Sequence, residues 1–378
     1  MSNTSAALVI GLCSHGLAVT RALAKEGVTV FAIEQNFDLP GTKTNSVKQI
    51  FPVKSFEAAD LVPALLQIRQ QLSKWQNVVL MPTNDNHVKI VGEALAQLVP
   101  PYLLSWGHCC ADILMLQKKD FLEPAAIKQQ INYPRSVTFG STEAAAEKTQ
   151  GMRFPMILKP AKPMSSFKTL VVENTEQLTK QLYNYQHDFP IIGQEYIAGN
   201  DKTLFFAEML LDNGTVIQNV TGRKLASHPP ARGQATIAEL YPNVEVARLA
   251  EQLIAPYQLS GPIAVELKMA PDGSYWMIEP TVGRTEFLVE LIIAAGFNQP
   301  YQEFMVALKQ PVTQYDDITP TVWFDCERAP LNYLKACWSE KSLLPFGKRL
   351  TFTYFNLKDL GPFVKAMMLL VKRIILKK

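Results

Sequence analysis

An apolar strand, a glycine turn, a helix and a second apolar strand follow one another over the first 34 residues. Residues 7–10 are apolar, residues 17–24 carry apolar side chains at helical spacing, and residues 28–33 are apolar and β-branched. This order is a βαβ unit, whose crossover helix makes its two strands parallel. The start of the chain therefore predicts a parallel sheet.

The same alternation continues downstream. Residues 78–81 are apolar, residues 88–98 follow a helical pattern, and residues 102–104 resume a strand-like run. A parallel sheet built in this way binds ligands at the carboxyl ends of its strands. The loops that we expect to touch the substrate carry Ser14, His15, Asn84 and Asp85.

Beyond residue 119 the pattern changes to short strands joined by hairpin turns. Asn213-Gly214 and Asp272-Gly273 each separate two strand-like runs, and both dipeptides are typical of hairpins. Ser141 is placed to cap a helix over residues 142–148. We predict an α/β chain with an N-terminal domain (1–115), two α+β units (116–200 and 201–330) and a C-terminal segment (331–378).

The composition excludes several classes of protein. The net charge is +3, from 37 basic and 34 acidic residues, and the cations form no aromatic-interleaved blocks, so nucleic acid is not an expected partner. The five cysteines show no CxxC spacing, which argues against a disulfide framework and a structural zinc site and favours a reducing compartment. The N-terminus lacks the pattern of a signal peptide, and we expect a cytoplasmic protein.

The glycine turn is the first candidate for a ligand site. Gly11 and Gly16 have GxxxxG spacing, and Glu34 follows the second strand where a dinucleotide-binding unit places its ribose carboxylate. The middle glycine that admits a pyrophosphate is absent, and Leu17 stands where a Walker-A motif has lysine. We favour a structural or substrate-binding turn and keep an NAD-dependent dehydrogenase as an alternative.

Two glutamates and a lysine form a second candidate site. Glu266 and Glu279 lie in apolar strand runs on either side of the Asp272-Gly273 turn, so a hairpin would bring them together. Adjacent carboxylates in apolar surroundings are unfavourable unless cations neutralise them, and Mg²⁺ prefers oxygen ligands that it shares with phosphates. Lys159 ends another apolar strand, where a fixed cation suits a phosphate. The alternative interpretations are that the two glutamates form salt bridges and that the lysine is simply exposed to solvent.

The order of these elements resembles the ATP-grasp superfamily of carboxylate–amine ligases, from the glycine turn to Phe287. Lys119, before INYPRSVTF, matches the cation that opens the helix preceding the family's G-I-x-x-P segment, and Lys159 matches its second nucleotide lysine. The resemblance implies an ATP-grasp fold, in which two subdomains clasp ATP and Mg²⁺. It also implies an adenine-binding hinge at Glu195, Tyr196 and Ile197, a ribose carboxylate at Asp201, and metal ligands at Glu266 and Glu279.

Two segments depart from the family pattern. Where members have E-x-N-P-R, this chain has EPTVGR over residues 279–284, with Thr281 in the asparagine position. The phosphate-covering loop over residues 161–167 contains no glycine. The EPTVGR segment and the GRK segment at residues 222–224 are similar to a branch associated with polysaccharide modification and aspartate-type ligation.

A basic segment over residues 221–235 contributes Arg223, Lys224, His228 and Arg232. Acyl-phosphate chemistry needs cations beside the transferred phosphoryl group and an anionic substrate, so Arg223 and Arg284 are candidate catalytic residues. A mobile solvated loop is the alternative interpretation of this segment.

The expected function is ATP-dependent joining of a small-molecule carboxylate to an amine through an acyl phosphate, with Mg²⁺. Three alternatives stay open: a nucleotide-binding protein with a degenerate catalytic site, the dehydrogenase, and a carboxylase or kinase of the same superfamily.

The C-terminal tail is basic and amphipathic. Six of the seven charged residues between positions 358 and 378 are cations. Phe363, Met367, Leu370 and Ile374 share one helical face, and the apolar run 366–371 is too short to span a bilayer, which needs ~20 residues. Docking on the protein's own core, contact in a homodimer, and peripheral association with the inner face of an anionic membrane are the alternatives.

Overall fold

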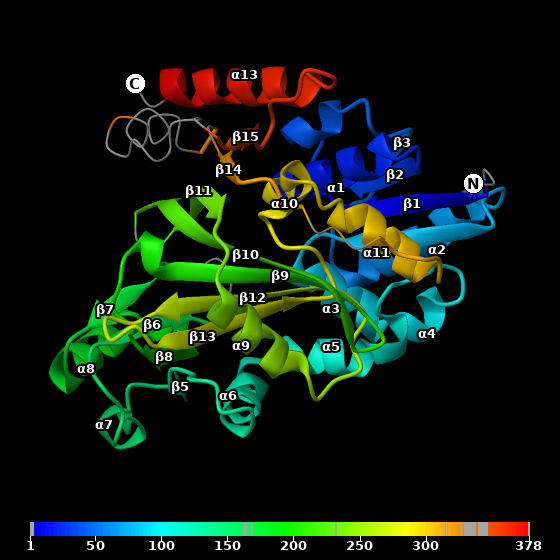
Figure 1. Ribbon diagram of the computed structural model, residues 1–378. Helices are drawn as coiled ribbons and strands as arrows, with labels where there is room; N and C mark the ends of the chain where they lie inside the picture. The colour runs from blue at the N-terminus through cyan, green and yellow to red at the C-terminus, as the bar shows by residue number, and fades with distance from the viewer. Residues whose placement is uncertain are drawn as a thin grey trace.

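The computed structural model describes residues 4–161, 165–167, 169–230, 233–313, 315, 317–325, 327–328, 338 and 347–376. Three β-sheets organise the chain (Figure 1): a parallel N-terminal sheet, a small antiparallel sheet and a large mixed sheet. The predicted α/β class is confirmed.

The N-terminal sheet is parallel throughout, with strand order β3-β2-β1-β4. Its strands are β1 (Ser5–Ile10), β2 (Thr29–Glu34), β3 (Gln49–Pro52) and β4 (Asn77–Pro82). Its helices are α1 (Ser14–Lys25), η1 (Pro40–Lys43), α2 (Ala58–Gln71), α3 (Asp85–Glu93), α4 (Leu95–Leu98), η2 (Gly107–Cys109) and α5 (Cys110–Leu116). The βαβ prediction is confirmed, whereas residues 102–104 contribute only a bridge between Val79 and Leu103.

The small sheet is antiparallel, with strand order β5-β8-β6-β7. Its strands are β5 (Ser136–Phe139), β6 (Met156–Pro160), β7 (Leu170–Val172) and β8 (Ile191–Glu195), accompanied by α6 (Lys119–Lys128), α7 (Ala145–Lys148), α8 (Thr175–Asn184) and η3 (Gln186–Asp188). The predicted Ser141 cap is wrong. The Ser141 hydroxyl accepts the Glu143 N–H in the preceding turn, and α7 begins three residues later than expected, at Ala145.

The large sheet has the order β13-β12-β9-β10-β11-β14-β15. Its strands are β9 (Leu204–Asp212), β10 (Thr215–His228), β11 (Gln234–Leu240), β12 (Gly261–Met269), β13 (Tyr275–Val282), β14 (Thr321–Phe324) and β15 (Arg349–Phe352). Its helices are η4 (Asp201–Thr203), α9 (Val244–Ile254), α10 (Val289–Ala295), α11 (Gln299–Ala307) and α13 (Gly361–Leu376). Both hairpins predicted from Asn213-Gly214 and Asp272-Gly273 are present.

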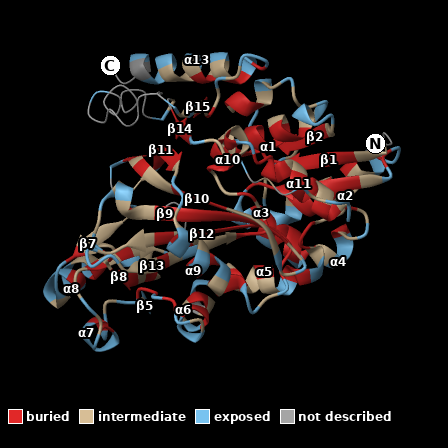
Figure 2. Cartoon of the chain, viewed as in Figure 1, coloured by how far each residue is buried: buried red, intermediate tan, exposed pale blue. Residues whose placement is uncertain are grey.

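One apolar core joins the N-terminal sheet to the large sheet, and Figure 2 shows buried residues running continuously between them. This core contains Leu8 of β1 together with Val265 of β12 and Met277 of β13. The small sheet has its own core, built around Phe139 and Leu158. No described helix is both long and apolar enough to cross a membrane.

Candidate functional site

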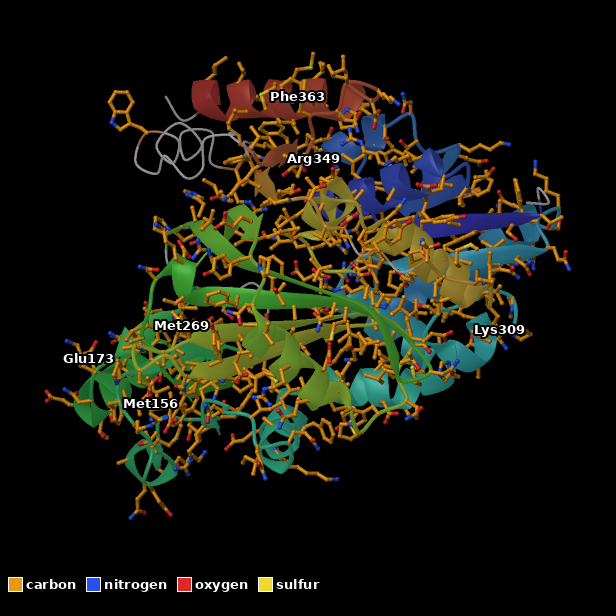
Figure 3. The ribbon with its side chains drawn as sticks, in the orientation of Figure 1. Met156, Glu173, Met269, Lys309, Arg349 and Phe363 are labelled. Carbon is orange, nitrogen blue, oxygen red and sulfur yellow. The ribbon has the colours of Figure 1, made fainter. Side chains whose placement is uncertain are left out.

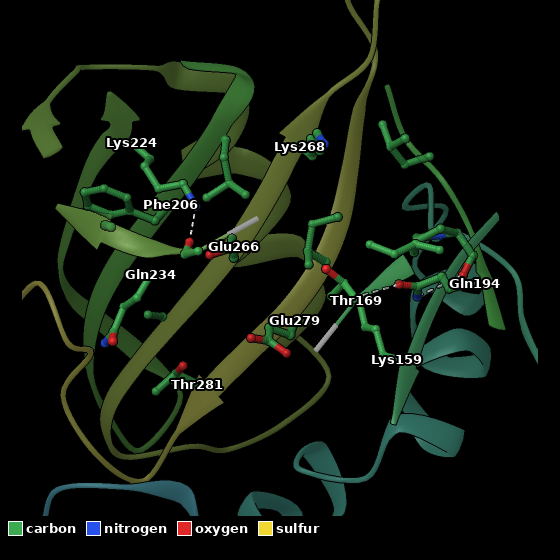
Figure 4. Close-up of a pocket in the computed structure, with 18 of the residues that line it drawn as sticks. Lys159, Thr169, Gln194, Phe206, Lys224, Gln234, Glu266, Lys268, Glu279 and Thr281 are labelled. Carbon is green, nitrogen blue, oxygen red and sulfur yellow. Dashed lines mark hydrogen bonds between the residues drawn. The ribbon is translucent and has the colours of Figure 1, made fainter. Parts of the chain in front are cut away.

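Glu266 and Glu279 lie side by side on the large sheet. They are directly opposed in the antiparallel pair β12–β13, so both side chains leave the same face (Figure 4). Burial, and then the charge of Glu279, raise the pKa of Glu266 to about 7, while Lys224 opposes the shift. The predicted pairing is confirmed, and the two carboxylates would be stabilised by a shared cation.

A cavity of about 440 Å³ separates these carboxylates from the small sheet. Lys159 of β6 lines it from the opposite side (Figure 4), and a second cavity of about 660 Å³ shares Lys159 and Glu279 with the first. Among the described residues, five lysines line the two cavities: Lys119, Lys128, Lys159, Lys224 and Lys268. A cleft with several cations around two carboxylates fits a polyphosphate carrying a divalent metal.

The metal-binding capacity of this cleft depends on the two glutamates. In the described part of the chain, no group of three or more His, Cys, Asp or Glu residues could hold a metal ion. Mg²⁺ needs no such group, because it commonly takes one or two protein carboxylates and completes its shell with water and substrate phosphates. Glu266 and Glu279 therefore fit Mg²⁺ bound together with a nucleotide.

Lys159 is half-buried in the lining of the cleft. Its Nζ lies 3.4 Å from Gln194 Oε1, and burial lowers its pKa while the charge of Glu279 raises it. Lys119 begins α6 and lines the second cavity. The structure thus brings Lys119, Lys159, Glu266 and Glu279 to one cleft, and their roles there stay predictions.

The predicted hinge lies at the end of β8 and lines the first cavity. The Glu195 carboxylate accepts the Arg153 N–H at 3.0 Å and its Nη2 at 3.1 Å, so the hinge side chain is occupied within the protein. The Tyr196 N–H donates to Pro155 O at 2.9 Å. The Ile197 N–H makes no hydrogen bond within the described residues and is free to pair with a ligand at this edge.

Asp201 is tied to a neighbouring strand. Its carboxylate accepts the Ser227 N–H at 3.0 Å and the Ser227 hydroxyl at 2.8 Å, and lies 3.6 Å from Lys224 Nζ. It is not among the described residues that line either cavity. Its predicted bond to a ribose would have to compete with these internal partners.

Arg223 does not line the cleft. Its Nε and Nη2 donate to Glu239 Oε1 at 2.9 and 2.8 Å, and its guanidinium lies 4.2 Å from the ring centre of Tyr241. Side chains alternate across a strand, so Arg223 and Lys224 project to opposite faces of β10. Arg223 is thus not among the described residues that line either cavity, and its role beside the phosphates stays a prediction. Lys224 is the cation that faces the cavity, and Arg232 lies outside the described residues.

Arg284 lies where the large sheet meets the N-terminal sheet. Its Nε donates to Asp85 Oδ1 at 2.7 Å, and Asp85 begins α3 just after β4. The adjacent Thr285 hydroxyl lies 2.6 Å from Nε2 of His15, whose pKa is lowered to about 3 by burial and by the charge of Arg284. The loops expected to touch the substrate therefore meet Arg284 at the carboxyl ends of the parallel strands.

Two glutamates near Arg284 were not predicted from the sequence. Glu208 of β9 is buried, and neither of its carboxylate oxygens has a hydrogen-bond partner among the described residues. Glu286 lines the first cavity and accepts the Leu288 N–H at 2.7 Å. Burial raises the pKa of both, and the charge of Glu286 raises that of Glu208 further. The sequence pattern that could have indicated Glu208 is a single carboxylate within the apolar strand FFAEMLL.

The glycine turn is built for packing. A Cβ on Gly16 would lie 2.0 Å from the Gly11 carbonyl oxygen. The buried Glu34 carboxylate accepts N–H groups of Leu12, Gln35 and Asn36 at 2.6 to 2.9 Å. Its oxygens are thus occupied by backbone N–H groups of the turns that follow β1 and β2, which favours the structural interpretation of Glu34 over a dinucleotide site.

The predicted phosphate-covering loop is described only in part, because residues 162–164 lie outside the described residues. Ser166 donates its N–H to Asp188 Oδ1 at 3.0 Å, and its hydroxyl bonds to the same carboxylate. This part of the loop is held against η3.

Comparison with known proteins identified solved structures of the same fold. No family model and no curated protein matches the sequence. N5-carboxyaminoimidazole synthetase from Staphylococcus aureus, complexed with ADP, matches with a TM-score of 0.67 and 13% identity, over 90% of this chain and 86% of that one. An L-amino acid ligase from Bacillus licheniformis matches with a TM-score of 0.63 and 16% identity, over 85% and 78%. Phosphoribosylglycinamide synthetase from Anaerococcus prevotii matches with a TM-score of 0.61 and 15% identity, over 84% and 79%. At these identities the likeness shows a shared fold.

Proposed function

The chain has the ATP-grasp fold, and on this premise we propose that it is an ATP-dependent ligase that joins a carboxylate to an amine. The observation that carries the proposal is the opposed pair Glu266 and Glu279, which faces Lys159 across one cavity. Ligase and synthetase names among the enzymes of similar fold support this class of reaction.

The proposed chemistry has two steps. A carboxylate oxygen of the substrate attacks the γ-phosphorus of ATP, and ADP leaves. The amine nitrogen then attacks the acyl carbon, the C–O bond to phosphate breaks, and the amine loses a proton as the amide forms. Phosphorylation makes the second step feasible because phosphate is a far better leaving group than oxide.

The cleft supplies charge for the first step. Glu266 and Glu279 would hold Mg²⁺, which neutralises phosphate charge when bound. Lys119, Lys159 and Lys224 line the cavities and would contact phosphate oxygens. Because the Glu195 carboxylate is occupied, adenine recognition at the hinge would fall to backbone groups such as the Ile197 N–H.

The second step would take place between the opposed pair Glu266 and Glu279 and the N-terminal sheet. Arg284 lies there beside Asp85, and a guanidinium suits an anionic substrate. Glu286 lines the cavity, and burial raises its pKa, so it is placed to accept the proton that the amine releases.

A second candidate function is nucleotide binding without turnover. Two observations favour it: Asp201 is engaged with Ser227 and Lys224, and Thr281 lines the cavity where the resembling family has an asparagine ligand.

The test is a screen for phosphate release with ATP and Mg²⁺ across amino acids and uronic acids, with mass spectrometry of the products. Amine-dependent phosphate release with a new amide supports the ligase. ATP-induced thermal stabilisation without release for any substrate supports the second candidate. Stimulation by bicarbonate rather than an amine indicates a carboxylase, and absence of ATP binding refutes both proposals.

A further inference from the structure

A line of apolar side chains lies exposed on the outer side of α13, away from the catalytic cleft. Four of them recur at helical spacing and are 47% to 65% exposed, and two more lie on the turn before the helix. We call these six residues the apolar stripe: Leu357, Leu360, Val364, Met368, Val371 and Ile375.

The opposite face of α13 packs on the protein. Ala366 is completely buried, and Phe363 contacts Phe355 with ring centres 5.2 Å apart. Figure 3 shows Phe363 on α13 above the strand that carries Arg349. Met367 and Leu370 line an apolar cavity of about 370 Å³ between the helix and β15. The helix therefore has two apolar faces, of which the protein covers one, and an apolar helix face is ordinarily buried.

The start of α13 is fixed firmly to the N-terminal domain. The Asp359 carboxylate accepts Arg21 Nε at 2.8 Å, the Thr44 hydroxyl at 2.6 Å and the Asn45 N–H at 3.0 Å. This anchor sets the rotation of the helix and so holds the apolar stripe outward.

Cations border the apolar stripe. Lys365 directly follows Val364 and Lys372 directly follows Val371, so both lysines flank the stripe on the same side of the helix. Lys372 is exposed, whereas Lys365 Nζ lies 3.6 Å from Asp38 Oδ1. Residues 361–376 contain no acidic residue, and Lys358 lies exposed beside Leu357. A second copy packed on this face would oppose cations to cations, whereas anionic headgroups complement them.

We propose that α13 docks the protein on the surface of a bilayer that contains anionic lipids. The apolar stripe enters the boundary between headgroups and acyl chains, and the exposed Lys358 and Lys372 contact the headgroups. The helix lies in the plane of the membrane surface and does not cross it.

The experiment is co-sedimentation of the full chain with vesicles of phosphatidylcholine, with and without phosphatidylglycerol. Binding should require phosphatidylglycerol and fall with added salt. The double variant Met368→Gln/Val371→Gln should weaken partitioning about tenfold or more, because it removes two apolar side chains from the interface. Lys372→Gln should weaken it about fivefold.

The matched controls lie on α8, at the far side of the molecule from α13 (Figure 1). Tyr183→Gln and Lys180→Gln remove an exposed apolar side chain and an exposed cation there and should leave partitioning unchanged. Absence of binding, or equal binding to both kinds of vesicle, overturns the proposal. A dimer that the Met368→Gln/Val371→Gln variant converts to monomer in sedimentation velocity also overturns it, because a second copy would then cover the apolar stripe.

Discussion

Replacing Glu279 with glutamine should stabilise the metal-free protein at neutral and higher pH while abolishing its Mg²⁺-dependent turnover. The two effects have one cause: Glu279 lies opposite Glu266, and their like charges repel unless a cation lies between them. Glu279 is exposed in the cleft, so the substitution leaves no cavity in the core.

The magnitude follows from the pKa of Glu266. Raising this pKa from 4.5 to about 7 destabilises the ionised folded state by about 3 kcal/mol. Burial is the larger cause and Glu279 the next, so we assign about 1 kcal/mol to Glu279. Because the folded pKa lies above the unfolded one, the penalty is absent below about pH 4.5, grows between about pH 4.5 and 7, and is constant above that range.

The assay is denaturant unfolding of both proteins from about pH 5 to pH 8 in a metal chelator. The difference in unfolding free energy between variant and wild type is the readout, because titrating groups that Glu279 does not influence, such as the buried Glu303, contribute equally to both. Lys159 and Glu286, whose pKa values the charge of Glu279 raises, are exceptions. Glu173→Gln, at an exposed position beside α8, is the matched control. A stabilisation that is equal at both ends of the pH range would refute the reasoning, as would Mg²⁺-dependent turnover at the wild-type rate.

Three further predictions concern the cleft and the glycine turn. Lys159→Ala should weaken ATP binding about tenfold or more in calorimetry, through loss of a charged phosphate contact, while the exposed Lys180→Ala control binds normally. Arg284→Lys should slow amide formation, measured by mass spectrometry, because lysine cannot reproduce the planar guanidinium contact. ATP affinity should not change, because Arg284 is not among the described residues that line the two cavities. A matching loss of ATP affinity would contradict this prediction. Gly16→Ala should lower the free energy of unfolding by about 2–3 kcal/mol, because its Cβ meets a backbone carbonyl, whereas Gly140→Ala, which meets nothing within 4 Å, should change little.

Local chemistry made the opposed pair of glutamates predictable. The Asp272-Gly273 turn lies midway between Glu266 and Glu279, so turn type and strand pattern together oppose them. The βαβ unit was predictable for the same reason, since apolar periodicity over residues 7–33 specifies each of its elements in turn.

The misplaced and missed residues depend on long-range packing. Strand alternation turns only one of Arg223 and Lys224 toward the cleft, and the strand pairing of β10 that decides which one is not visible in composition. Asp201 is bound by a serine 26 residues away, and Glu208 is buried by strands from separate hairpins. The surroundings of each of these residues are set only once the strands of the large sheet have paired.

The separate apolar cores divide the walls of the cleft between two structural units, the large sheet with the N-terminal sheet on one side and the small sheet on the other. Glu266 and Glu279 belong to the large sheet, whose core is continuous with that of the N-terminal sheet, and Arg284 follows strand β13 of the same sheet. The small sheet, which carries Lys159, has its own core and joins the rest through residues 133–135 and 196–203. A motion of the small sheet as one unit would therefore move Lys159 relative to the two glutamates. Under the proposed function, such a motion would change the distance between the phosphate-binding lysine and the metal-binding carboxylates without altering the carboxylate pair itself.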